Sequence, residues 1–116
     1  MATVLGRQVW NTKRVSSTTW TPLLTTDTGS AESCGRLSDR SIQVIGTLGA
    51  GGSINVQGSN DGTTWATLSD PAGVALATMG VGIEEILENT LFVRPVVVGG
   101  DGTTSITVIL TAASTA

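Results

Sequence analysis

The chain has 116 residues, a size at which a single domain is the expectation, and charged residues make up only 13% of it. Six Lys and Arg residues against nine Asp and Glu residues give a formal net charge of −3, and this balance disfavours direct nucleic-acid binding. No apolar stretch approaches the roughly 20 residues that span a bilayer, so we expect no membrane contact.

The composition favours strands and turns and argues against an enzyme. Thr and Ser are abundant and 15 Gly residues supply turns, whereas the chain has no His. The absence of His removes the usual general base near neutral pH and the commonest transition-metal ligand. The single Cys34 allows no internal disulfide and no Cys/His zinc site within one chain, and we interpret it as an inert thiol. We therefore expect no catalytic activity and no cofactor.

Residues 1–16 are basic and show no sustained apolar period. We predict an extended N-terminal arm or an edge strand here, followed by one β domain over residues 17–116, and we expect removal of the arm to spare the fold. Trp10 and Trp20 could fold back onto the core or insert into a partner, and aromatic anchors beside basic residues are typical of interfaces. The candidate partner-binding residues are Arg7, Trp10, Lys13, Arg14 and Trp20.

Farther along the chain, short apolar and alternating segments predict strands. Residues 18–26 form the first, with Pro22 requiring an edge or a bulge, and residues 27–39 are expected to be a loop. Alternation with a period of two then predicts strands at 40–48, 54–57, 74–78 and 106–111, and the Asp-Gly turn at 61–62 predicts a returning strand at 64–68. The near-continuous apolar run at 91–98 predicts a central strand, except that Pro95 must face an edge or a bulge. Residues 80–89 fit a strand or a single turn. About seven to eight strands at this spacing predict an antiparallel β-sandwich or jelly roll.

Acidic residues allow more than one interpretation. Glu84, Glu85 and Glu88 form an acidic cluster, for which a solvated face or an ion pair between subunits is favoured over a glycosidase pair, because the chain is short for a sugar cleft. The Asp-Gly turns at Asp61 and Asp101 each offer few of the six to eight oxygens that calcium prefers.

The segment SNDGTTW, residues 59–65, resembles the hairpins of sialidase Asp boxes and of some discoidin-like sugar-binding domains. The resemblance implies that the Asp and Thr side chains bond backbone groups of the turn and that the Trp packs beneath it. A hairpin-stabilising role is therefore favoured. The alternative is that Trp65 is exposed and stacks on a sugar, as in a carbohydrate-binding module for host attachment.

Four segments between Asp39 and Leu110 resemble small structural proteins of tailed-bacteriophage virions: DRSIQVIGTLG, INVQGSNDGTTWATLSDPAGVAL, LFVRP and GGDGTTSITV. The resemblance implies a homo-oligomer, with a trimer favoured, that binds the major capsid protein or other virion proteins. The favoured role is a head decoration or cement protein on the capsid surface, synthesised in the host cytoplasm. A tail, neck or baseplate component is the alternative, because one fold can serve several functions. The resemblance brings no catalytic, cofactor or metal residue onto this chain.

Overall fold

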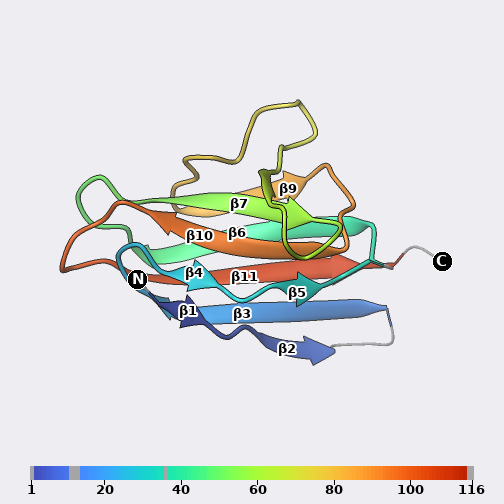
Figure 1. Cartoon of the computed structure of the whole chain (residues 1–116), viewed down its shortest axis with the longest axis horizontal. Helices are drawn as coiled ribbons and strands as arrows, with labels where there is room; N and C mark the ends of the chain where they lie inside the picture. Colours follow the sequence, from blue (N-terminus) through green and yellow to red (C-terminus); the bar gives the residue numbers. More distant parts are fainter. Residues whose placement is uncertain (1, 11–13, 36, 115–116) are drawn as a thin grey trace.

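The computed structural model describes residues 2–10, 14–35 and 37–114, and within these ranges every regular element is a β-strand (Figure 1). Eleven strands form two sheets that pack face to face. The described ranges contain no helix, and thus none long and apolar enough to cross a membrane. The predicted all-β sandwich is confirmed.

The first sheet, called the β10 sheet, has the order β1-β4-β10-β7-β8, with β5 also paired with β10. Its strands are β1 (Thr3–Val4), β4 (Thr28–Gly29), β5 (Glu32–Ser33), β7 (Ser53–Ser59), β8 (Ala66–Thr67) and β10 (Phe92–Val98). The second sheet, called the β11 sheet, has the order β2-β3-β11-β6-β9. Its strands are β2 (Arg7–Trp10), β3 (Val15–Leu23), β6 (Asp39–Thr47), β9 (Gly82–Ile86) and β11 (Ser105–Ala113). The order β3-β11-β6-β9 facing β4-β10-β7-β8 is that of a jelly roll.

The core lies between the sheets and follows the alternation of the sequence. In β6, Ile42 and Val44 are completely buried, whereas Ser41 and Gln43 are only half-buried on the outer face. The same pattern runs through β7, β10 and β11. Successive side chains of a strand point to opposite faces, so the apolar residues of both sheets meet in one layer. The largest fully buried apolar side chains are Trp20, Leu23, Ile42, Ile54, Ile106 and Leu110.

The N-terminal residues belong to the sandwich. β1 pairs in parallel with β4, and β2 pairs antiparallel with β3, so residues 2–10 contribute a strand to each sheet. Gly6 lies so close to the core that a Cβ at this position would be 2.7 Å from Nε1 of Trp20. The edge-strand interpretation therefore describes this segment better than a free arm. The predicted boundary between residues 16 and 17 is wrong, because it falls inside β3, which pairs continuously from Val15 to Trp20 with β11.

Two prolines show how the strands tolerate a missing N–H. Pro22 lies at a bulge, because Thr21 and Pro22 together oppose Thr107 of β11, as predicted. Pro95 lies in a central strand, flanked by β7 on one side and by β4 and β5 on the other. The central position confirms the prediction for residues 91–98, whereas Pro95 is at neither an edge nor a bulge, which corrects the prediction for that residue. Its position faces the gap between β4 and β5, where β10 has no paired residue to bond.

The segment predicted as a loop, residues 27–39, contains the short strands β4 and β5. Thr28 pairs with Val96, and Ser33 pairs with Phe92, so this segment covers one side of β10. The sequence did not predict these strands, because this polar segment has no alternating apolar pattern. β9, in contrast, confirms the strand interpretation of residues 80–89.

Candidate functional site

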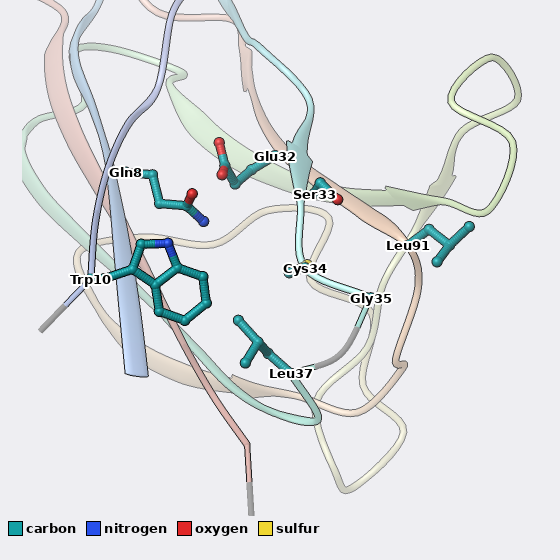
Figure 2. A pocket seen from close by; sticks show the side chains of 8 residues that line it. All are labelled: Gln8, Trp10, Glu32, Ser33, Cys34, Gly35, Leu37 and Leu91. Atoms are coloured by element: carbon teal, nitrogen blue, oxygen red, sulfur yellow. The ribbon is translucent and has the colours of Figure 1, made fainter. Parts of the chain in front are cut away.

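An open groove of about 570 Å³ lies at the edge of the sandwich where β2 of the β11 sheet faces β5 of the β10 sheet. Figure 2 shows the side chains of Gln8 and Trp10 on one side of this groove and those of Glu32 and Leu37 across from them. The groove is lined by Gln8, Trp10, Glu32, Ser33, Cys34, Gly35, Leu37 and Leu91. It therefore draws on three segments that are far apart in the sequence.

The groove combines apolar side chains with polar ones, among them one carboxyl group. Trp10 is 46% exposed and Leu91 is 48% exposed at the rim, whereas Cys34 and Leu37 are buried beneath. Glu32 is half-buried, and burial raises the pKa of its carboxyl group above the usual value. Such a surface suits a protein segment that covers the exposed indole and leucine.

Cys34 has the environment of a structural thiol. Its side chain is 4% exposed, and burial raises the pKa of the thiol, an effect that Arg40 opposes and Glu32 reinforces. A raised pKa keeps the group protonated near neutral pH, whereas the reactive form of cysteine is the thiolate. The geometry agrees with the interpretation of Cys34 as an inert thiol.

Arg40, a residue that the sequence did not single out, holds the loops beneath the groove. Its side chain is 2% exposed. Its Nε donates to the carbonyl of Leu37 at 2.7 Å, and its Nη2 donates to the carbonyls of Cys34 at 2.8 Å and Thr90 at 2.7 Å. Its Nη1 donates to the carbonyl of Glu88 at 3.2 Å. One guanidinium group thus ties the segment after β5 to the segment before β10.

The structure separates the five predicted partner-binding residues. Trp10 lines the groove, and Arg7 is exposed on β2. Arg14 directly precedes β3 and makes contacts within the chain, whereas Lys13 lies outside the described residues. Trp20 is a correction: it is 0% exposed and its Nε1 donates to the carbonyl of Ser30 at 3.1 Å, so it belongs to the core and offers no surface to a partner. Its position in β3 points inward, in phase with the buried Thr18.

The SNDGTTW segment forms a braced loop between β7 and β8. Oδ1 of Asp61 accepts hydrogen bonds from the backbone N–H groups of Thr63 at 2.8 Å and Thr64 at 2.7 Å. Oγ of Ser59 accepts from the N–H of Gly62 at 2.9 Å. The hydrogen bonds from the N–H groups of Thr64 and Thr63 hold the pKa of the Asp61 carboxyl group far below its usual range. The loop therefore has the hairpin-stabilising role that its sequence favours.

Trp65 packs on the outer face of the β10 sheet. It is half-buried, and the Arg94 guanidinium lies 4.1 Å from the centre of its ring. Nε of Arg94 also donates to Oε1 of Gln57 at 2.9 Å. A cation–π contact of this kind adds about 0.5–1 kcal/mol at an exposed site. Arg94 thus covers part of the indole that a sugar would need.

The acidic cluster divides into two parts. Glu88 turns toward the chain, accepting hydrogen bonds from the N–H of Ser69 at 2.8 Å and from its hydroxyl at 2.6 Å. Burial would raise the pKa of Glu88, but these two bonds hold it below its usual value. Glu84 and Glu85 are exposed on β9. No group of three or more His, Cys, Asp or Glu residues in the described part of the chain is placed to hold a metal ion.

Comparisons with solved structures identify similar folds. The crystal structure of the SPBc2 prophage-derived protein YomS is 14% identical in sequence, with a TM-score of 0.67, and the match covers 91% of this chain and 100% of YomS. A cupin domain from Bordetella pertussis Tohama I is 10% identical, with a TM-score of 0.51, covering 99% of this chain and 96% of that domain. These likenesses show the fold alone. No protein-family model and no curated protein matches the chain.

Proposed function

We propose that this chain is a structural protein of a tailed-phage particle, a head decoration protein that binds the capsid shell as a homo-oligomer, with a trimer favoured. The fold likeness to a prophage-derived protein supports a phage origin, since it extends over the full length of that protein. The segments between Asp39 and Leu110 that resemble virion proteins support the same assignment.

The observation that carries the proposal is the groove between β2 and β5. Two large apolar side chains, Trp10 and Leu91, stand 46% and 48% exposed at its rim. Leaving such groups in water is unfavourable by about 25 cal/mol for each Å² of apolar surface, so a partner that covers them gains binding energy. A shell offers the same partner segment many times, and repeated weak contacts then give high avidity when the copies are linked.

The test is binding to empty phage heads. The purified protein should sediment with heads and raise their melting temperature. The double substitution Trp10→Ala and Leu91→Ala should weaken head binding at least about tenfold, as expected for an aromatic anchor in an interface. The matched control is Leu24→Ala, because Leu24 is also 48% exposed but lies just after β3, away from the groove.

Failure to bind heads would overturn the decoration role. Binding to purified tails or necks in the same assay would instead support the alternative particle location. If the control weakens head binding as much as the double substitution does, the groove is not the contact surface. Each variant is checked by its unfolding midpoint, so that loss of binding is separated from loss of fold.

A further inference from the structure

The two outer strands of the β11 sheet, β2 and β9, present unpaired edges. All four residues of β2 and four of the five residues of β9 are exposed. Within the described ranges, β2 pairs only with β3, and β9 pairs only with β6. An open strand edge carries a row of free N–H and C=O groups that can pair with another strand, so these edges are natural places for a protein contact.

The β2 edge combines apolar side chains with one positive charge. Leu5, Arg7 and Val9 alternate along the chain, and Leu5 is 80% and Val9 49% exposed. Leu5 directly precedes β2 with Gly6 between it and Arg7, and its exposure shows that it points outward, whereas Gly6 faces Trp20 in the core. We call Leu5, Arg7 and Val9 the basic edge.

The β9 edge has the same spacing with the opposite charge. Ile83, Glu85 and Leu87 alternate along the chain, and Ile83 is 63% and Leu87 52% exposed. Ile86, between Glu85 and Leu87, is buried in the core, so its neighbours point outward. Leu87 follows β9, and its N–H donates to the carbonyl of Ser69 at 2.9 Å, so the free backbone of this edge is that of β9 itself. We call Ile83, Glu85 and Leu87 the acidic edge. The sequence had suggested an inter-subunit ion pair for this cluster.

The order of the sheet fixes how two copies can meet. Four successive antiparallel pairings lead from β2 through β3, β11 and β6 to β9, so β2 and β9 run in the same direction. A second copy in the same orientation therefore brings its β2 parallel to β9 of the first, with both outer faces on one side. Placing Arg7 beside Glu85 then aligns three pairs: Leu5 with Ile83, Arg7 with Glu85, and Val9 with Leu87.

From this complementarity we infer that copies of this chain associate head to tail, the basic edge of one copy pairing in parallel with the acidic edge of the next. If two basic edges met, Arg7 of one copy would lie opposite Arg7 of the other. If two acidic edges met, the two Glu85 side chains would lie opposite each other. Like charges directly opposite each other destabilise a strand pair. Charge thus selects the head-to-tail contact, and such a contact closes into a ring when the rotation between copies allows it.

Charge reversal tests the contact in the full chain, with oligomer mass measured by native mass spectrometry and light scattering. Arg7→Glu and Glu85→Arg should each raise the dissociation constant of the oligomer roughly tenfold or more, since like charges across an interface are strongly unfavourable. The double variant, carrying both changes, should return to within about threefold of the parent, because the pair is restored with reversed signs. Glu84→Arg is the matched control: it changes the net charge equally, but Glu84 points to the other face of β9.

A disulfide test fixes the register. A variant with Val9→Cys and Leu87→Cys in one chain should, on oxidation, give covalent multimers larger than a dimer, because each copy offers one thiol at each edge. The variant with Val9→Cys alone should remain uncrosslinked. Cys34 is buried and does not interfere.

Three results would overturn the inference: a monomeric parent protein at about 100 μM, far above the micromolar range of weak specific contacts; single reversals that the double variant does not rescue; or a Glu84→Arg effect equal to that of Glu85→Arg. A parent protein that oligomerises as described but does not bind heads would instead refute the decoration role and leave this contact standing.

Discussion

Replacing Arg40 tests whether one buried guanidinium holds the floor of the groove. Arg40→Leu keeps a side chain of moderate size but removes every donor. The bonds from Nε to the carbonyl of Leu37, at 2.7 Å, and from Nη2 to the carbonyl of Cys34, at 2.8 Å, are fully buried. The carbonyl of Leu37 would lose its donor, whereas the carbonyl of Cys34 would keep the N–H of Leu37 at 3.0 Å. The acceptors at Glu88 and Thr90 are nearer to solvent.

The magnitude follows from the two buried bonds that are lost. The unsatisfied carbonyl of Leu37 costs about 1–3 kcal/mol, and the bond lost at the carbonyl of Cys34 adds about 1 kcal/mol, so the sum is about 2–4 kcal/mol. Burying the positive charge of Arg40 is itself unfavourable, and burial lowers the pKa of its guanidinium, so removing the charge offsets part of this cost. We expect a net loss of about 1–3 kcal/mol in the free energy of unfolding. For a chain of this size the melting temperature should fall by about 4–12 °C.

The assay is urea unfolding followed by tryptophan fluorescence, to which the buried Trp20 contributes together with Trp10 and Trp65, with the slope of the transition compared to confirm a two-state change. Arg94→Leu is the matched control, since Arg94 lies on the outer face of the β10 sheet with Gln57 and Trp65 as partners. It should cost about 1 kcal/mol or less. An Arg40→Leu variant that loses less than about 1 kcal/mol, or no more than the control, would show that Arg40 does not hold the floor of the groove.

Two further predictions concern β4 and the groove. A Cβ at Gly29 would lie 2.6 Å from Cδ of Pro95, so Gly29→Ala should lower the free energy of unfolding by about 1–3 kcal/mol, whereas Gly102→Ala, with open space around it, should change it by less than about 0.5 kcal/mol. Equal effects in urea unfolding would contradict the close contact of β4 with β10. Burial raises the pKa of Glu32, so its contribution to stability is present below the unfolded pKa and lost as pH rises through the folded pKa. Glu32→Gln should therefore raise the melting temperature at pH 7 but not near pH 3, where the carboxyl group is protonated in both states, and a gain of equal size at both pH values would disprove the burial argument.

The sandwich could be predicted because its central strands obey one simple rule. Buried residues alternate with outward-facing ones in β6 and β11, and that pattern is visible in the sequence without any partner. The short strands β4 and β5 obey no such rule. They exist because β10 offers them a free side, as the pairing of Val96 with Thr28 shows, and a pairing of this kind is a property of the folded sheet.

The site was less predictable because it too depends on which strands and loops become neighbours in the folded sandwich. Trp10 and Trp20 look alike in the sequence, yet one is 46% exposed and the other 0%, because β2 is an edge strand and β3 has a neighbour on both sides. Arg40 reads as a surface charge at the start of an alternating strand. Its burial depends on carbonyl groups of two distant loops, which no local pattern records. The groove between β2 and β5 is likewise created by tertiary contact alone.

The position of the N-terminal strands changes how assembly can be separated from folding. The sequence suggested that residues 1–16 could be removed without harm to the fold. The structure gives a different expectation, because Thr28 donates to the carbonyl of Ala2 at 2.8 Å and Gly6 lies against Trp20. A truncation would remove a strand from each sheet and uncover the largest core residue, so lost assembly would be indistinguishable from lost stability. Substitutions at the outward-facing Arg7 and at Trp10 leave these inward contacts in place, and they are therefore the changes that can isolate assembly.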